Sequence, residues 1–166
     1  MRHILVNHLG VYELVEVRAT DDQGGEIFVA TTDHQEIASN FVLGFLNDCF
    51  PNEKSPDECA RETVTRHIQN GSLFLWKNSK GDTVSMAAKN RESRNAAAIS
   101  LVYTPKELRG QGYASRIVAR LTQKLLDEGK SKCNLFTDLK NPTSNSSYQK
   151  IGYRFLGESI HFDFMS

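Results

Sequence analysis

Hydrophobic residues follow two spacings along the chain, and together these predict the order of its strands and helices. Alternation of apolar and polar residues, or a short β-prone run, is typical of a strand, whereas apolar residues three and four positions apart are typical of a helix. In the first half, these patterns predict strands at 12–19 and 26–30, helices from 32 to before 51 and from 55 to 70, and a hairpin of strands at 72–77 and 82–88.

Both predicted helices begin at a capping signal. Thr32, with a glutamine three residues later, resembles a capping box. The second helix has Ser55 as its cap and Pro56 in its first turn, and Gly71 is a suitable C-terminal stop. The first helix would bury one stripe of side chains, made of Ile37, Phe41, Phe45 and Cys49.

The second half of the chain predicts a strand–helix–strand unit. A strand at 96–103 leads through a glycine turn into a helix that ends at Gly129. Because a helix lies between them, the strand at 132–138 should run parallel to the strand at 96–103. The helix would bury Ala114, Ile117, Val118, Leu121 and Leu125. The chain closes with a short helix at 141–150 and a hairpin of strands at 152–156 and 159–164, joined at Gly157 and Glu158.

These elements indicate an α/β (α+β) protein built on one mixed, mostly antiparallel central sheet. One parallel strand pair lies in the middle of the sheet, and helices flank it. A chain of 166 residues suits one domain, which we place at 26–166. Residues 1–25 form either an N-terminal arm or an extra strand.

Composition narrows the class of protein. The chain has 20 basic residues (lysine and arginine) and 20 acidic residues (aspartate and glutamate), so its net charge is zero. This balance argues against binding nucleic acid or membranes through bulk charge. No run approaches the ~18 apolar residues that a membrane span requires. Cys49, Cys59 and Cys133 form no CxxC pair, which predicts free thiols, no metal site and a cytoplasmic location.

The turn after the strand at 96–103 is the first candidate site. It reads Arg109-Gly110-Gln111-Gly112, and the first N–H groups of the helix that follows have no partner within the helix. The helix dipole is positive there, and glycine lets a ligand approach, so such a turn suits a phosphate. It matches neither a Walker A loop nor the G-x-G-x-x-G of a dinucleotide site. The alternative is a turn that serves only strand–helix packing.

A second polar patch follows the strand at 132–138. Asn141, Ser144 and Tyr148 share one face at helical spacing. Parallel strands deliver their C-terminal ends to one edge of a sheet, so this patch and the turn at 109–112 should meet at one crevice. The alternative is a helix capped by Asn141 with a solvated, serine-rich surface.

Both patches resemble motifs of the GNAT acyltransferase superfamily. The run from Arg109 to Ala114 is similar to its R-x-x-G-x-G/A signature. Residues 141–153 resemble its second motif: an Asn, a small residue three positions on, a Tyr seven on, then Gly and an aromatic residue. The likeness covers the chain from about Glu26 to its end, and 135–146 resembles a bacterial subgroup without an assigned substrate. Residues 1–25 have no clear counterpart.

The resemblance implies an acetyl-CoA-dependent N-acetyltransferase whose parallel strands splay apart around the cosubstrate. A primary amine of a small molecule or peptide would attack the acetyl carbonyl directly, with Tyr148 as general acid for the departing thiolate. Backbone N–H groups of the turn would hold the pyrophosphate, and the strand before it would pair with the pantetheine arm. The implied cofactor-binding residues are Leu101, Val102, Tyr103, Arg109, Gly110, Gln111, Gly112, Tyr113, Ala114, Ser115, Asn141 and Ser144.

The general base and the acceptor stay open. Many members of the superfamily place a glutamate on the strand before the turn, but residues 96–102 contain no acid. The candidates for the base are a water chain, Asp138 and His161. The missing acid leaves a non-catalytic acyl-CoA-binding protein as an alternative, and a nucleotide-binding protein unrelated to CoA as a third. A paired edge strand at 12–19 is one route to a homodimer.

Overall fold

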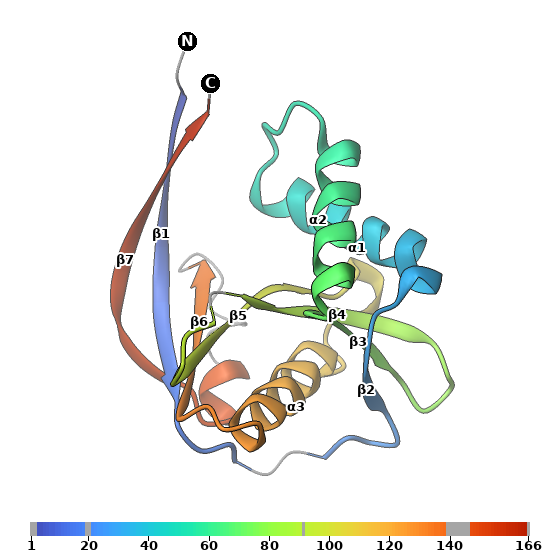
Figure 1. The fold of residues 1–166 in the computed structure, drawn as a ribbon, viewed down its shortest axis with the longest axis vertical. Helices are drawn as coiled ribbons and strands as arrows, with labels where there is room; N and C mark the ends of the chain where they lie inside the picture. The colour runs from blue at the N-terminus through green and yellow to red at the C-terminus, as the bar shows by residue number, and fades with distance from the viewer. Residues whose placement is uncertain (1–2, 19–20, 91, 139–146, 166) are drawn as a thin grey trace.

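The computed structural model describes residues 3–18, 21–90, 92–138 and 147–165, which form a seven-stranded sheet with helices on both faces (Figure 1). Two 3-10 helices, Thr32–His34 and Lys106–Leu108, precede α1 and the glycine turn, and residues 147–150 are helical. The helices are α1 (Gln35–Cys49), α2 (Pro56–Asn70) and α3 (Tyr113–Asp127). The strands are β1 (His3–Leu14), β2 (Glu26–Val29), β3 (Leu73–Lys77), β4 (Thr83–Asn90), β5 (Ala96–Tyr103), β6 (Lys132–Asp138) and β7 (Arg154–Met165).

The strands lie in the order β2-β3-β4-β5-β6-β1-β7. Neighbouring strands are antiparallel except β5 and β6, whose parallel register runs from Ala96↔Lys132 to Ile99↔Leu135. The predicted mixed sheet with one parallel pair is therefore confirmed. The crossover through α3 creates that pair, as expected for a strand–helix–strand unit.

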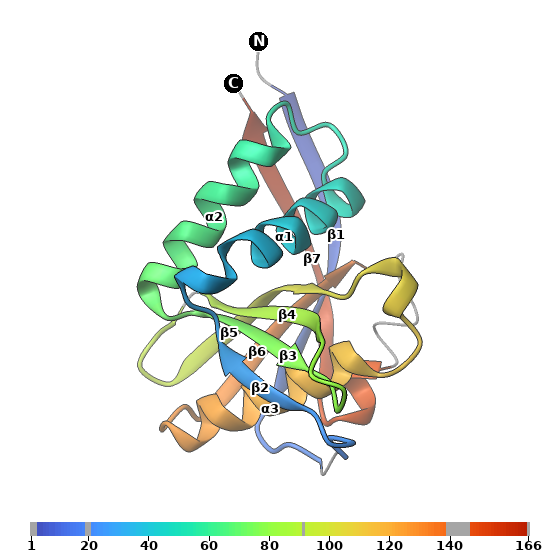
Figure 2. The same cartoon turned by 90° about the vertical axis from the view of Figure 1, so that its right-hand side faces the viewer.

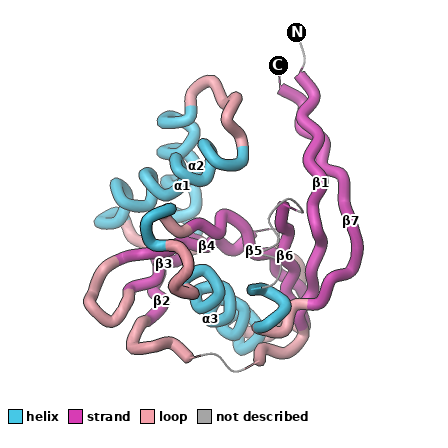
Figure 3. Tube along the Cα trace, turned by 180° about the vertical axis from the view of Figure 1, so that it is seen from behind, coloured by secondary structure: helices cyan, strands magenta, loops and turns pink. Residues whose placement is uncertain are grey.

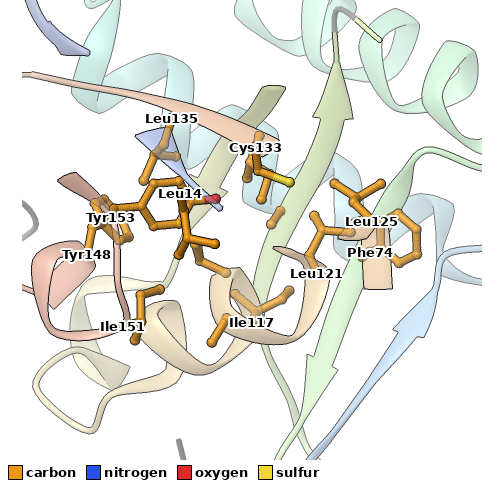
Figure 4. Packing of buried hydrophobic residues seen from close by; sticks show 14 of the residues in the cluster. Leu14, Phe74, Ile117, Leu121, Leu125, Cys133, Leu135, Tyr148, Ile151 and Tyr153 are labelled. Atoms are coloured by element: carbon orange, nitrogen blue, oxygen red, sulfur yellow. The ribbon is translucent and has the colours of Figure 1, made fainter. Parts of the chain in front are cut away.

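The helices enclose two buried cores, one on each face of the sheet (Figure 2). On one face, α1 and α2 cover Leu73, Leu75 and Met86, each with no exposed surface. On the other face, α3 contributes the predicted stripe, with Ala114 only half-buried. Figure 4 shows this α3 core, in which Ile117, Leu121 and Leu125 lie with Phe74, Cys133 and Leu135.

Helix α1 differs from its prediction at the cap and on the buried face. Thr31 rather than Thr32 is a cap, but it caps the 3-10 helix Thr32–His34, and its backbone N–H donates to Nδ1 of His34 at 2.9 Å; the N-cap of α1 itself is His34. Cys49, predicted to be buried, is exposed. The predicted stripe repeats every four residues, so it drifts by about 40° per step around a helix of 3.6 residues per turn. The side chains that α1 buries are Ala38, Phe41, Val42 and Leu46.

Other elements follow their predictions closely. Helix α2 has Ser55 as N-cap and Pro56 as first residue, and Gly71 ends it with a φ of +63°. Strands β3, β4, β5 and β6 lie within two residues of the predicted ranges.

Strand β1 differs in extent and position from the predicted strand at 12–19. It spans His3–Leu14 and lies inside the sheet, between β6 and β7. Because β1 has a neighbour on each side, it is not the edge strand that the predicted route to a homodimer required.

The predicted terminal hairpin is wrong, because β7 is one continuous strand. Gly157 and Glu158, expected at a turn, pair with Val11 and Gly10 of β1. The glycine instead adjoins a bulge in which β7 gains one residue, Leu156, over β1. Figure 3 shows the two long strands side by side, with both chain ends at the same end of the molecule.

Candidate functional site

Strands β5 and β6 separate at one end, and this opening is the centre of the candidate site (Figure 1). Their pairing stops at Ile99 and Leu135. Beyond that point, β5 remains paired with β4, where Tyr103 is opposite Met86, and β6 remains paired with β1. The backbone of β5 after Ile99 therefore has no β6 partner on that side.

A bulge in β5 lies at the same place. Between the pairs Ala88↔Ser100 and Met86↔Tyr103, β5 has one residue more than β4. Leu101, within the bulge, has a φ of +54°, a left-handed conformation that is uncommon for leucine. Bulges bend a strand and re-aim its side chains, so the opening is built into the backbone of β5.

Ser100, at the start of the opening, has a buried hydroxyl without a partner. Within the described ranges, its Oγ is the one buried side-chain oxygen or nitrogen that makes no hydrogen bond. Ile99 faces the α3 core, so strand alternation directs Ser100 towards the α1 and α2 face. Leaving such a group unsatisfied costs about 1–3 kcal/mol, which a ligand in the opening would recover. Sequence reasoning missed this residue, whose one signal is a polar side chain inside an apolar run.

The phosphate turn, residues 109–112, follows the end of β5 and leads into α3. Gly110 and Gly112 have φ values of +86° and +81°, which glycine adopts at little cost. A Cβ at Gly110 would meet no atom within 4 Å, and one at Gly112 would meet only the Arg116 guanidinium. Among the described residues, the N–H groups of 110–115 have no acceptor, and the first helical bond joins Arg116 N–H to Gly112 O at 3.1 Å. The turn thus presents a row of free donors that suits a phosphate.

Arg109 turns its side chain back onto the protein. Its Nε donates to the carbonyl oxygen of Thr104 at 2.8 Å, and a terminal nitrogen donates to Asp48 of α1 at 2.9 Å. Its backbone N–H donates to the Lys106 carbonyl at 3.3 Å, and its guanidinium lies 5.5 Å from the ring centre of Tyr103. Burial, followed by the nearby Asp48 charge, raises the pKa of the Tyr103 phenol, which therefore stays protonated. Arg109 fixes the shape of the turn against α1.

Tyr148 is the one member of the second patch within the described residues, because Asn141 and Ser144 lie outside them. Tyr148 is 6% exposed and lies at one end of the α3 core, near Tyr153 and Leu135 (Figure 4). Burial raises the pKa of Tyr148, so the phenol keeps its proton at neutral pH. Among the described residues, its hydroxyl has no hydrogen-bond partner.

The two side chains predicted as bases are placed by their backbones. Asp138 is the last residue of β6, at the open end, and pairs with Leu9 of β1. His161 pairs with Asn7 and lies on β7, two strands away from β6. The side chains of both residues fall outside the described part of the structure.

The three cysteines are free thiols. Burial raises the pKa of Cys133 to about 11, so this thiol is a packing group and a poor nucleophile.

In the described ranges, no three His, Cys, Asp or Glu side chains gather in a group that could hold a metal ion. The helices of those same ranges are too short or too polar to cross a membrane.

A family comparison agrees with this geometry. The model of the FR47-like protein family matches residues 78–161, which are 84 of the 166 residues. The chain belongs to the FR47-like family. The matched part of this FR47-like protein runs from the turn after β3 into β7, so it contains the phosphate turn and both diverging strands. The predicted membership of the GNAT superfamily is confirmed by this match together with the solved structures. No curated protein sequence matches the chain.

Solved structures share the fold at low sequence identity. A protein from Novosphingobium aromaticivorans, named as a GNAT-family acetyltransferase, is 19% identical with a TM-score of 0.71 over 96% of this chain and 65% of its own. A GNAT-family acetyltransferase from Colwellia psychrerythraea is 15% identical with a TM-score of 0.73, over 98% and 57%. A protein from Clostridium acetobutylicum, named as an acetyltransferase with acetyl-CoA, is 17% identical with a TM-score of 0.59, over 76% and 87%. The chain spans between half and two thirds of the first two.

Proposed function

We propose that this FR47-like protein is an acetyl-CoA-dependent N-acetyltransferase that acts on a primary amine of a small molecule or a peptide. The GNAT fold supports acyl transfer in general. The observation that carries the proposal is the row of N–H donors at 110–115, because it follows a strand whose parallel neighbour diverges from it. A ligand with both a pyrophosphate and an extended amide arm fits that combination, and acetyl-CoA has both.

Two segments would hold acetyl-CoA. The N–H groups from Gly110 to Ser115 would bind the pyrophosphate, with Arg109 fixing the turn from behind. The backbone of Leu101, Val102 and Tyr103 would pair with the pantetheine amides, as an added strand does. Asn141 and Ser144 are further proposed contacts, which rest on the sequence motif alone. When bound, acetyl-CoA supplies a thioester carbonyl that an amine can attack.

The proposed chemistry of the chain is proton transfer and hydrogen bonding. Tyr148 keeps its proton at neutral pH and would donate it to the leaving sulfur. The free Oγ of Ser100 can donate to a ligand oxygen in the opening. Strand β5 carries no carboxylate, so the base would be a water chain, Asp138 or His161. Of the two residues, Asp138 lies nearer to the opening between β5 and β6, because it is the last residue of β6, whereas the strand of His161, β7, is two strands away.

The test combines binding and turnover on the full chain. Calorimetry with acetyl-CoA compares the wild type with Gly112→Trp, whose side chain would fill the turn. A panel of primary amines is then assayed for release of free CoA with a thiol reagent. We expect binding by the wild type alone and CoA release with at least one amine. No binding at about 1 mM acetyl-CoA, the upper end of usual KM values, contradicts the proposal.

A non-catalytic acyl-CoA-binding protein is the second candidate, and the absence of an acid on β5 favours it. It predicts that acetyl-CoA binds without any release of CoA across the amine panel. Release with any amine excludes it. For either candidate, the three free cysteines support a proposed cytoplasmic location.

A further inference from the structure

Exposed apolar side chains gather where β1 ends and β7 begins. Of the five large apolar side chains that are exposed in the described ranges, three lie here: Val15, Phe155 and Leu156, at 65%, 43% and 52%. Val15 follows the last residue of β1, and the other two are the second and third residues of β7. Single exposed apolar residues are ordinary, whereas a group of them marks an interaction surface. We call these three residues, together with Glu16 and Arg154, the β7-edge surface.

The β7-edge surface lies at the margin of the sheet. Among the described strands β7 is the outermost, with β1 as its neighbour (Figure 1). An open edge invites pairing by another chain, but a bulge disrupts the ladder of backbone hydrogen bonds. The bulge at Leu156 interrupts β7 between the pairs Tyr12↔Phe155 and Val11↔Gly157. A partner at this end of β7 would therefore be held by side chains.

A hollow of about 630 Å³ adjoins the exposed apolar residues. Side chains from 13–18, with Gly152 and Arg154, line it. A Cβ at Gly152 would come within 2.8 Å of the Glu16 carbonyl oxygen, so the glycine allows the two segments to lie close together. The backbone N–H of Arg18 donates to the carbonyl oxygen of Ile151 at 3.0 Å and fixes this contact. The β7-edge surface thus combines exposed apolar side chains with a hollow of defined shape.

The hollow carries charges of both signs that have no partner within the chain. In the described ranges, the side chains of Glu16, Arg18 and Arg154 make no ion pair or hydrogen bond. Glu13 differs, because the Lys132 ammonium lies 3.7 Å from its carboxylate. An unpaired carboxylate beside an unpaired guanidinium is complementary to a second copy of itself, since a two-fold axis brings each group to its opposite.

We infer that the β7-edge surface joins two copies of this chain across a two-fold axis. Leu156 of each copy enters the hollow of the other, and Glu16 of each faces Arg154 of the other. A second copy is the occupant because one surface supplies the hollow, the side chain that fills it and charges of both signs. Residues 12–19 would then contribute to a homodimer beside an edge strand, β7, rather than as the edge strand itself.

The dimer leaves the opening between β5 and β6 accessible. In the β1–β6 register, Leu14 is opposite Cys133 next to the β7-edge surface, whereas Leu9 is opposite Asp138 at the open end. The two regions therefore lie towards opposite ends of these strands. The inference does not rest on the proposed function.

Analytical ultracentrifugation of the full chain measures the oligomeric state. Leu156→Arg places a charge at the centre of the inferred interface. Its control is Val29→Arg, which places the same side chain at a residue that is 44% exposed on β2, the opposite edge of the sheet. A second pair of variants, Arg154→Glu and Glu16→Arg, is measured separately and as an equimolar mixture. Urea unfolding establishes that each variant is folded.

We expect a mass of about twice 18.7 kDa for the wild type and for Val29→Arg. Leu156→Arg should weaken the dimer roughly 10- to 100-fold, as for a residue at the centre of an interface. Arg154→Glu and Glu16→Arg should each weaken it alone, because each brings like charges together. Their mixture should restore the dimer, because each variant then meets the opposite charge on the other.

A mass of one chain for the wild type at about 100 μM overturns the inference, because interfaces of standard size bind at micromolar concentrations or below. A dimer that tolerates Leu156→Arg overturns it too, as does a mixture of the charge variants that associates no better than either alone. Calorimetry with CoA separates this result from the proposed function. CoA should bind equally to every folded variant, and its failure to bind the wild type would contradict the proposed function while the dimer still stands.

Discussion

The guanidinium of Arg109 donates to the carboxylate of Asp48 at 2.9 Å, and this contact joins the phosphate turn to the last turn of α1. The two residues are 61 positions apart in the sequence. Tyr103, at the end of β5, lies against the same guanidinium, and a Cβ at Gly44 of α1 would overlap its hydroxyl. The helix on one face of the sheet and the turn at its edge are therefore held as one unit.

Disrupting this ion pair should affect ligand binding more than stability. The side chains of Arg109 and Asp48 are 45% and 31% exposed, so water screens the pair. The coupling energy between the two residues in the free energy of unfolding should therefore be about 0.2–1 kcal/mol. A double-mutant cycle of Arg109→Gln and Asp48→Asn, measured by urea unfolding, gives this value. Both single variants should weaken CoA binding, and the double variant should be no worse than Arg109→Gln. Additive losses in CoA affinity would contradict a shared role.

Replacement of Gly110 should weaken CoA binding as well as destabilise the fold. Gly110 and Gly71 have φ values of +86° and +63°, and a Cβ at either would meet no atom within 4 Å. Replacement by alanine should cost each about 1–2 kcal/mol in unfolding free energy, because a left-handed conformation disfavours a Cβ. Only Gly110→Ala should also weaken CoA, by roughly 3- to 10-fold if one donor is lost. Equal CoA affinity in both variants would remove the turn from the site.

The N-terminal strand should be essential for folding. Leu14 is 1% exposed in the α3 core, whereas its neighbour Val15 is 65% exposed. Leu14→Ala should lower the free energy of unfolding by about 2–5 kcal/mol, the usual cost of emptying a core position. Val15→Ala should change it by less than about 0.5 kcal/mol. Similar stabilities for the two variants would show that β1 does not belong to the core.

The elements that were predicted correctly from the sequence are specified by residues within the element or at its ends. The phosphate turn has its glycines, α3 has its stripe from Ile117 to Leu125, and Gly71 marks the end of α2. Strand β1 has no such local signal, because its pairing with β7 joins opposite ends of the chain. An alternating pattern such as Tyr12 to Leu14 is compatible with either an edge or a central position.

Gly157 shows the same limit of sequence-based prediction near the C-terminus. A glycine next to a polar residue between two β-prone runs resembles a hairpin turn, and the same residues serve equally as part of a bulged, continuous strand. A cavity of about 300 Å³ lined by Asp22, Trp76 and Arg116 could not be predicted either, because segments that are distant in the sequence form it. Tyr148 is a mixed case, since a motif identified it but only the fold shows that its ring is buried.

His67 should make the protein less stable in mild acid. It is 6% exposed, and its Nδ1 lies 2.6 Å from the Ser72 hydroxyl. Burial, with a smaller effect of Arg66, lowers the pKa of His67 below its ordinary value of 6.5. The unfolded chain therefore binds this proton more readily, and stability is lost as the pH falls below about 6.5. Urea unfolding between pH 7.5 and 5 should show a shallower loss in His67→Gln than in the wild type. Parallel curves would contradict the assignment.

Tyr148 offers the sharpest test of the proposed chemistry, because a second buried tyrosine serves as its control. Tyr153 is 2% exposed, and burial raises its pKa as well, but its hydroxyl is paired with Thr122 Oγ1 at 2.6 Å. Within the described ranges, the Tyr148 hydroxyl has no such partner.

Tyr148→Phe should therefore leave acetyl-CoA affinity and stability nearly unchanged and lower kcat by about 10²- to 10⁴-fold, the usual contribution of a general acid. Tyr153→Phe should do the reverse, costing about 1 kcal/mol in unfolding free energy with turnover retained, because it leaves Thr122 without its partner. Calorimetry, urea unfolding and the CoA-release assay separate these effects. Full turnover in Tyr148→Phe would assign its hydroxyl a structural role, and the proton of the leaving thiol would then have to come from another group at the opening between β5 and β6.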